Sequence, residues 1–455
     1  MTNAGLNFGR NFAGMRRMGW CVALVGWLAL GGWAEGMWIT GYYPQYEAST
    51  MAAAQIDFTT VTHAIHFAVA PKADATLDTT SFGLAPAACG AFVGAVHGAG
   101  RKALVCVGGA GSQAGFEGAT TGFNAPYFVT ALTSFMRTNG YDGVDIDWEP
   151  LDDSDVEAYT NFVGALRAAI GPGKLLTVAA PAYTEGAMFA GVQRNFDQIN
   201  IMTYDLSGPW PGWVTWFNSP IQDGGYKFPS TGRLVPSVDG AVADFEKAGV
   251  AGERLGIGAA FYGYAWSGGA GVTQPRQGWN ASNPPYMTVL TYQEIVAGYY
   301  QGAHYHWDNG GQAAYLSVTN SPASNDLFIS YDDAKACQSK VSYARNHGLG
   351  GIMIWEVSQD YNGGAAAGQR SPLMLALKQA LATPRILSVA ASNGNLSVTF
   401  SSAPLANYRI LWTSNLAAGS WSTLSNGVSG TGGAVQVTDT LTAAGARFYR
   451  VQTPP

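Results

Sequence analysis

The stretch Tyr141–Pro150, which reads YDGVDIDWEP, limits the fold more than any other part of this chain. Side chains of a β-strand alternate between its two faces, so Asp145, Asp147 and Glu149 would share one face. The residues between them are apolar: Val144, Ile146 and Trp148. Neighbouring carboxylates repel one another and shift one another's pKa values, which suits a row of acids that ends in an active site. A solvated acidic face is the alternative, but the apolar face is unlike that of an exposed edge strand.

Apolar runs typical of buried strands alternate with amphipathic stretches from Trp38 onward. The predicted strands are Trp38–Tyr43, Val61–Ala68, Lys102–Gly108, Gly143–Glu149, Leu175–Ala182, Ile199–Asp205, Leu255–Phe261 and Gly351–Val357. The clearest helical stretches are Ala91–Ala99, Pro126–Thr138, Asp155–Ala169 and Val238–Ala248. This alternation predicts an α/β fold, a parallel (β/α)8 TIM barrel. An open doubly wound sheet is the alternative, but no predicted strand is followed by a GxGxxG loop.

Reactive groups of such barrels lie at the carboxyl ends of the strands. Here those ends carry tyrosines, tryptophans and carboxylates: Tyr42-Tyr43, His66-Phe67, Asp147–Glu149, Met202–Asp205, Phe261–Tyr264 and Trp355-Glu356. We therefore expect these side chains to converge on one site.

Two further regions depart from the barrel pattern. The connection between the seventh and eighth predicted strands is too long for an ordinary βα unit and carries strand and helix signals of its own. It predicts an inserted α+β subdomain at about residues 267–333 of a catalytic domain that spans residues 35–383. Short alternating runs separated by Gly, Asn and Ser then predict a small all-β, sandwich-like domain over residues 384–455, similar to fibronectin III.

Residues 1–34 are typical of a secretory signal peptide. Arg16 and Arg17 precede the apolar run Trp20–Leu30, and small residues before and at Ala34 suit cleavage after it. An N-terminal membrane anchor is the alternative, but the run is short for a bilayer. We expect a secreted protein, extracellular or periplasmic, that does not associate with a membrane after cleavage.

Composition narrows the range of partners and cofactors. Charged residues make up 12% of the chain, the net charge is −6, and there is no Lys/Arg run, which argues against nucleic acid as a partner. Cys21 would leave with the signal peptide, and the remaining cysteines allow at most one disulfide within the chain: Cys89, Cys106 and Cys337. Neither these cysteines nor the His63/His66 and His304/His306 pairs have the spacing of a metal site, so we expect no metal.

Five segments resemble the signature motifs of glycoside hydrolase family 18, the chitinase family. DGxDxDxE is matched in full by Asp142–Glu149, and SxGG appears as Cys106–Gly109, with Cys in place of Ser. Three more follow in order: MxYD at Met202–Asp205, a looser GxPFYG at Gly258–Gly263, and GGxMxW at Gly350–Trp355. The resemblance covers about Trp38 to Leu381, and the insertion, with Tyr331-Asp332-Asp333, is similar to the chitinase insertion domain.

The resemblance implies a retaining, substrate-assisted chitinase that needs no cofactor and acts as a monomer on chitin or chitooligosaccharides. Glu149 would be the general acid and base. Asp147 would stabilise the intermediate formed by the substrate's acetamide, Asp145 would share a proton with Asp147, and Tyr204 would bind the acetamide carbonyl. Alternatives are a chitin-binding lectin, or an endo-β-N-acetylglucosaminidase that acts on N-glycan cores.

The same resemblance suggests residues for sugar binding. Trp355 would form the floor of the pocket, with Met202, Asp205 and Tyr262 around it. Aromatic residues that could stack on further sugars, or equally pack in the core, are Tyr43, Phe67, Trp210, Trp213, Trp216 and Trp266. In the C-terminal domain, Tyr408, Trp412 and Trp421 have the same two interpretations.

Overall fold

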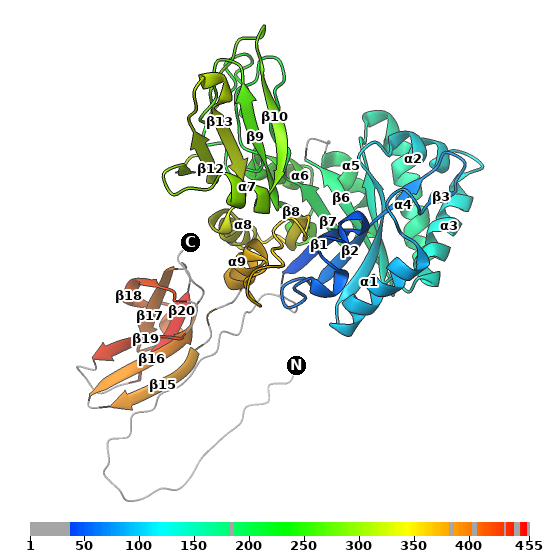
Figure 1. Cartoon of the computed structure of the whole chain (residues 1–455). Helices are drawn as coiled ribbons and strands as arrows, with labels where there is room; N and C mark the ends of the chain where they lie inside the picture. Colours follow the sequence, from blue (N-terminus) through cyan, green and yellow to red (C-terminus); the bar gives the residue numbers. More distant parts are fainter. Residues whose placement is uncertain are drawn as a thin grey trace, which may run out of the picture. The chain divides into compact units, whose positions relative to one another are not determined.

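A computed structural model of the chain describes residues 37–182, 186–381, 384, 386–392, 394–402, 407–431, 434–440 and 446–452 (Figure 1). The predicted signal peptide, residues 1–34 with Cys21, lies outside these residues. One compact unit spans Glu35–Leu381, and a second contains Ala382–Pro455.

Eight parallel strands form the centre of the first unit. They are β1 (Trp38–Pro44), β2 (His63–Pro71), β4 (Lys102–Gly109), β5 (Gly143–Trp148), β6 (Leu175–Pro181), β7 (Gln198–Met202), β8 (Leu255–Ala260) and β14 (Gly351–Trp355). The sheet closes because β1 pairs with both β2 and β14, and a short β3 (Leu77–Asp78) pairs with β2 in antiparallel orientation. The predicted (β/α)8 barrel is confirmed.

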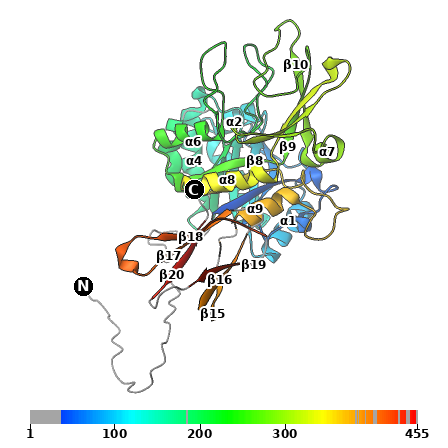
Figure 2. The same ribbon diagram turned by 90° about the vertical axis from the view of Figure 1, so that its left-hand side faces the viewer.

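Helices cover the outside of the barrel (Figure 1). They are α1 (Pro86–Gly98), α2 (Gln113–Thr120), α3 (Ala125–Thr138), α4 (Val156–Ile170), α5 (Gly186–Val192), α6 (Val238–Lys247), α8 (Ala334–Asn346) and α9 (Pro372–Leu381). Helix α8 packs against β8 and α9 (Figure 2).

The strands contribute to two separate hydrophobic clusters. The outer core lies between strands and helices and contains the apolar face of β5: Val144, Ile146 and Trp148. The inner core fills the barrel and includes Tyr42, Ile65, Leu104, Cys106, Tyr204 and Met353. Because side chains alternate along a strand, each strand supplies both cores.

The amino-terminal end of the barrel is closed by Trp38. Its indole Nε1 donates to Asn200 Oδ1 at 3.0 Å. A Cβ on Gly351 would lie 2.1 Å from Trp38 Cδ1, so only glycine leaves room for the indole. The glycine pair of the eighth-strand motif is therefore explained by packing far from the carboxyl ends.

The inserted subdomain is an antiparallel five-stranded sheet with one helix. Its strands, in sheet order, are β10 (Pro285–Thr291), β9 (Tyr262–Gly268), β13 (Leu327–Tyr331), β12 (Ala313–Val318) and β11 (Tyr305–Asp308), and its helix is α7 (Tyr292–Gly298). The sheet begins at Tyr262, earlier than the expected residue 267, because β9 starts one residue after β8 ends and its Tyr262 pairs with β10. A long loop, residues 203–237, packs on this sheet through a third cluster that includes Trp216, Phe217, Trp266 and Phe328.

The described part of the second unit contains two antiparallel three-stranded sheets. The first contains β15 (Ile386–Ser392), β16 (Asn395–Ser401) and β19 (Ala434–Thr440). The second contains β18 (Ser422–Ser429), β17 (Asn407–Thr413) and β20 (Phe448–Gln452). The guanidinium of Arg447 lies 3.7 Å from the ring centroid of Trp412, and that of Arg450 lies 4.5 Å from that of Trp421. Both tryptophans suggested for sugar binding thus have an arginine over the ring.

Within the described residues, no helix has both the length and the apolar character needed to cross a bilayer.

Candidate active site

A pocket of about 450 Å³ opens at the carboxyl ends of the barrel strands. Its lining is Tyr42, Tyr46, Phe67, Phe82, Ala110, Asp147, Glu149, Ala179, Pro181, Ala182, Met202, Tyr204, Asp205, Tyr262 and Trp355. The structure therefore brings together eight of the residues that the sequence suggested for the site: Phe67, Asp147, Glu149, Met202, Tyr204, Asp205, Tyr262 and Trp355.

Asp145 lies in the barrel interior, beneath the pocket. It is fully buried, and its two oxygens accept hydrogen bonds from Thr177 Oγ1 at 2.6 Å and Tyr42 OH at 2.7 Å. Burial raises its pKa to about 6, although the bonds from Thr177, Tyr42 and Cys106 oppose this rise. Asp145 is thus held in place and carries charge only above mildly acidic pH.

Asp147, the next acid of the row, is paired with Glu149. Burial is the largest influence and raises its pKa well above the usual value, and the charges of Glu149 and Asp145 and a hydrogen bond with Glu149 raise it further. Among the described residues, none bonds its other oxygen, Oδ1, which is buried. Asp147 therefore has an unused acceptor oxygen beside the pocket.

Glu149 directly follows β5, where the row of acids reaches the pocket. Burial is the largest influence and raises its pKa, the hydrogen bond from Asp147 lowers it, and the charge of Asp205 raises it again. The net rise favours the protonated form, which is the form required of a general acid.

The strand next to β5 supports these two acids. Gly108 has φ of +117°, and a Cβ there would lie 1.9 Å from the carbonyl oxygen of Asp147, so no other residue fits. Ser112 Oγ donates to that same carbonyl at 3.2 Å and accepts from Glu149 N–H at 3.1 Å. Sequence reasoning missed Ser112, which lies outside the strand and bonds only backbone atoms.

Aromatic side chains form much of the remaining wall. Trp355 lies 5.4 Å from Tyr42 and 4.9 Å from Phe67, measured between ring centroids. The buried Tyr204 hydroxyl lies 3.5 Å from Met353 Sδ. Burial and then the charge of Asp147 raise the pKa of Tyr204 well above its usual value, so the hydroxyl keeps its proton and can donate.

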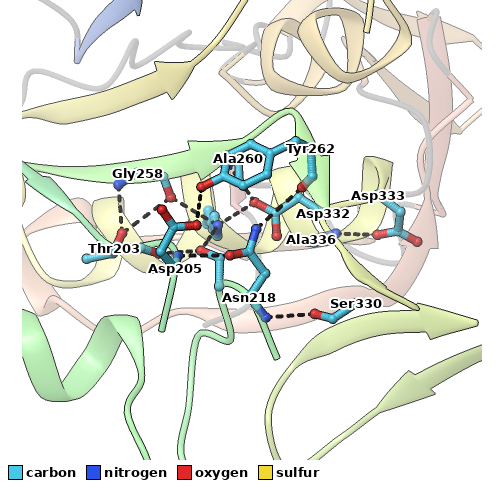
Figure 3. A network of polar contacts seen from close by, with 12 residues as sticks. Thr203, Asp205, Asn218, Gly258, Ala260, Tyr262, Ser330, Asp332, Asp333 and Ala336 are labelled. Carbon is cyan, nitrogen blue, oxygen red and sulfur yellow. Dashed lines mark hydrogen bonds and ion pairs between the residues drawn. The ribbon is translucent and has the colours of Figure 1, made fainter. Parts of the chain in front are cut away.

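Asp205 is fixed by three hydrogen bonds, of which Figure 3 draws those with Asn218 and Tyr262. Its backbone has φ of +57°, which is uncommon for a residue other than glycine, and its N–H donates to Asn218 Oδ1 at 2.8 Å. The hydroxyls of Tyr262 and Tyr264 donate to Asp205 Oδ1 at 2.5 and 2.7 Å. These partners come from the long loop and from β9, so the inserted sheet helps to build the pocket.

A buried ion pair lies behind this segment. Lys340 Nζ pairs with Asp332 and donates to Gly258 O at 2.9 Å and to Ser219 Oγ at 2.5 Å. Ser219 Oγ in turn donates to the carbonyl oxygen of Thr203, and Asp332 Oδ2 accepts from Ala260 N–H at 3.1 Å. The pair therefore ties α8 to β8 and to the chain just before Tyr204.

Two residues of the Tyr331-Asp332-Asp333 motif have structural roles (Figure 3). Asp332 belongs to the buried ion pair, and Asp333 caps α8 by accepting from Ala336 N–H at 2.7 Å. Sequence reasoning noted the motif but not its partner Lys340.

The sugar-stacking role predicted for three aromatic residues is wrong, because the structure buries their side chains. Tyr43 is 1% exposed, packs on Phe92 and donates to Met51 O at 2.9 Å, since it faces outward from β1. Trp216 and Trp266 are fully buried in the cluster between the long loop and the inserted sheet. None of the three has a ring face open to a sugar.

Trp210 and Trp213 lie on the long loop, outside the pocket lining, with ring centroids 4.6 Å apart. Trp210 is 48% exposed, so its sugar-binding role stays a prediction. Residues that line the pocket but were given no role from the sequence include Tyr42, Tyr46 and Phe82, and of these only Tyr42 was named, as part of a strand end. Side chains alternate along a strand, so Thr40 and Tyr42 lie on the same face of β1. This alternation was the signal in the sequence that Tyr42 points into the barrel.

Within the described part of the chain, no group of three or more His, Cys, Asp or Glu residues is arranged to hold a metal ion. Cys89, Cys106 and Cys337 are buried free thiols. His66 lies in the barrel wall, where its ring nitrogens bond Tyr141 OH at 2.7 Å and Gln45 Oε1 at 2.9 Å.

Comparison with known proteins identifies the family of the chain. The sequence profile described as "Glycosyl hydrolases family 18" matches residues 38–360. The chain belongs to glycosyl hydrolase family 18. The family resemblance read from the motifs is thereby confirmed.

Relatives of this family 18 protein include "Chitinase A1" of Niallia circulans, 31% identical over 294 residues that cover 57% of this chain and 41% of that protein. "Probable endochitinase" of Caenorhabditis elegans is 29% identical over 296 residues, 58% of this chain and 45% of that protein. The chain thus spans less than half the length of these two relatives. The barrel also resembles the solved structure of Ostrinia furnacalis Group IV chitinase in complex with allosamidin, with a TM-score of 0.64, 22% identity, and coverage of 76% and 99% of the two chains.

Proposed function

We propose that this family 18 protein is a secreted, monomeric chitinase that hydrolyses β-1,4 linkages between N-acetylglucosamine units with retention of configuration. The observation that carries the proposal is the row of acids along β5 and its carboxyl end, in which the buried Asp145 and Asp147 and then Glu149 lead into an aromatic pocket. The names of the relatives, both chitinases, support chitin as the substrate.

Glu149 is the proton donor in this proposal. It protonates the glycosidic oxygen as the bond from that oxygen to the anomeric carbon breaks. The same carboxylate then takes a proton from the water that attacks the anomeric carbon, which returns Glu149 to its starting state. The raised pKa of Glu149 suits both steps, since it brings the group closer to neutral pH.

The nucleophile in this proposal is the acetamide oxygen of the substrate. Most glycosidases place a second carboxylate across the scissile bond, and family 18 is among the stated exceptions. Asp147 extends from the same strand as Glu149, and Asp205 is engaged by two tyrosine hydroxyls, so neither is a free carboxylate on the opposite side. The acetamide forms a cyclic oxazolinium intermediate, which water opens.

Two side chains would hold the acetamide. Asp147, turning its charge or its free oxygen toward the acetamide N–H, stabilises the positive intermediate. The protonated Tyr204 hydroxyl donates to the acetamide carbonyl and keeps it below the anomeric carbon. Trp355 forms the apolar floor beneath the sugar ring.

The test is Glu149→Gln in the full chain. Turnover of soluble N-acetylglucosamine oligomers should fall by about 10²–10⁴-fold, while the oligomers still bind. Glu157→Gln, which changes an exposed acid on α4, is the matched control and should keep full activity. Unchanged turnover in Glu149→Gln would contradict the assignment. A parallel assay on an N-linked glycoprotein should release no glycan.

A further inference from the structure

A second hollow lies on the outside of the barrel, between α1, α3 and the turn that joins β2 to β3. It measures about 1000 Å³ and shares no lining residue with the catalytic pocket. Its lining is Asp74, Ala75, Thr76, Leu77, Pro86, Gly90, Phe123, Asn124, Tyr127, Ala131, Ser134, Phe135, Thr138 and Asn139. We call it the flank groove.

Two exposed aromatic side chains stand at one end of the flank groove. Phe123 is 78% exposed and Tyr127 is 55% exposed, and their ring centroids lie 4.9 Å apart with a tilt of 48°. Exposing two large rings side by side costs hydration free energy that burial would recover. Such a pair therefore fits a surface that another molecule covers.

Hydrogen bonds hold the backbone around the aromatic end of the flank groove. Asn124 Nδ2 donates to Ala73 O at 2.9 Å and to Gly118 O at 3.0 Å, which joins the β2–β3 turn to the α2–α3 turn (Figure 1). Helix α2 starts shortly after the carboxyl end of β4, so the aromatic end of the groove is near the end of the barrel that holds the pocket. From Tyr127 to Thr138 the groove follows α3 for about 17 Å, enough for several sugar rings.

The polar character of the flank groove suits a neutral, hydroxyl-rich ligand. Asp74 is its one ionisable acid, and Thr76 N–H and Oγ1 already occupy one of its oxygens; no lysine or arginine lines it. The hydroxyls of Ser134 and Thr138 have no hydrogen-bond partner among the described residues and are exposed. Aromatic rings beside unpaired hydroxyls can bind the apolar face and the hydroxyls of a pyranose ring together.

We propose that the flank groove is a second carbohydrate-binding site, which holds an N-acetylglucosamine polymer on the outside of the barrel. Phe123 and Tyr127 stack on the sugar rings, and Ser134 and Thr138 bond their hydroxyls. This site rests on the proposed function, because it takes the same polymer as the pocket. It raises the local concentration of an insoluble substrate and does not take part in the chemistry.

Hydrogen exchange of the full chain tests the site directly. The probe is N-acetylglucosamine hexamer at millimolar concentration, added to the Glu149→Gln variant so that it is not cleaved. We expect slower exchange in residues 143–149, at the pocket, and independently in residues 121–139. Adding Phe123→Ala and Tyr127→Ala should abolish protection of residues 121–139 alone, whereas Tyr127→Phe should keep it.

Kinetics supply the second measurement, in the chain with Glu149 intact. Phe123→Ala/Tyr127→Ala should lower the initial rate on insoluble chitin by about fivefold or more and leave turnover of a soluble trimer unchanged. Tyr300→Ala, which removes another exposed ring, should change neither rate. Protection at the pocket without protection of residues 121–139, or an unchanged rate on insoluble chitin, would overturn the flank groove site. No protection of residues 143–149 would overturn the proposed function, whatever the result for residues 121–139.

Discussion

The inner and outer faces of the barrel strands differ in chemistry although they share one backbone. On β1, the inward Tyr42 donates to a catalytic-row acid, Asp145, whereas the outward Tyr43 donates to a backbone carbonyl and packs on Phe92. On β5, acids face inward, and the outward residues belong to the outer core. The outer face thus stabilises the barrel, and the inner face positions the acids that lead to the pocket.

The largest expected effect compares two acids of the DGxDxDxE motif. Asp147→Asn should lower kcat on N-acetylglucosamine oligomers by about 10²-fold or more, because an amide cannot ionise to the carboxylate that stabilises the positive intermediate. Asp142 does not share the strand face of Asp145, Asp147 and Glu149. It accepts hydrogen bonds from Ala103 N–H at 2.9 Å and from His97 Nε2 at 2.8 Å.

Asp142→Asn should therefore lower the free energy of unfolding by about 1 kcal/mol with kcat within a few-fold of the parent. Steady-state kinetics and denaturant unfolding of both variants check this. Equal losses of kcat would show that the two acids act alike and would refute the division between them.

A smaller effect separates Tyr42 from Tyr43. Tyr42→Phe removes a donor to Asp145, so the pKa of Asp145 should rise above about 6 and the pH–rate profile should move with it. Tyr43→Phe should leave that profile unchanged and cost about 1 kcal/mol of unfolding free energy through the lost bond to Met51. A profile that moves in Tyr43→Phe, or stays fixed in Tyr42→Phe, would contradict the contrast.

The smallest effect concerns two buried acids outside the pocket lining. Burial raises the pKa of Glu356 and of Asp360 to about 7. Both folded-state values exceed the unfolded ones, so the stability that these two protonated acids contribute is lost as pH rises from about 4 through 7. Burial lowers the pKa of His63 to about 4 and that of His66 to about 3, so these two histidines act in the opposite direction over the lower part of that range. The contribution of the acids is therefore isolated by comparing thermal unfolding at pH 5 and pH 8 in the parent and in a variant of one acid.

Asp360→Asn should reduce that pH dependence. Its oxygen can still accept from Leu373 N–H and Met374 N–H, which now bond Asp360 Oδ2 at 2.9 and 3.0 Å. Between pH 5 and pH 8 the melting temperature of the variant should fall less, or rise more, than that of the parent, and equal changes in the two proteins would contradict this origin.

Much of the barrel could be predicted because its signals are local. A period of two along β5 separates acids from apolar residues, and strand–helix alternation gives the eight strands. The same alternation identifies Tyr42 as inward, but a tyrosine suits either face of a strand. The sequence therefore suggested Tyr43, the outward residue, for sugar stacking. Trp266 shows the related difficulty, since an indole fits a sugar and a core equally well.

What the sequence could not reveal depends on contacts between distant segments. Lys340 meets Asp332 and Gly258 only once α8 packs against β8. Likewise, Asp205 is bonded by Asn218 and Tyr264 because the long loop and the inserted sheet fold against each other. Neither arrangement has a periodic pattern that would reveal it in advance.

The central claim is that the acetamide of the substrate, with Glu149, breaks the glycosidic bond. The most direct measurement is the identity of new reducing ends released from partially deacetylated chitosan, determined by mass spectrometry. If the acetamide is the nucleophile, every new reducing end carries N-acetylglucosamine. New reducing ends of glucosamine, in proportion to its abundance in the polymer, would contradict the mechanism.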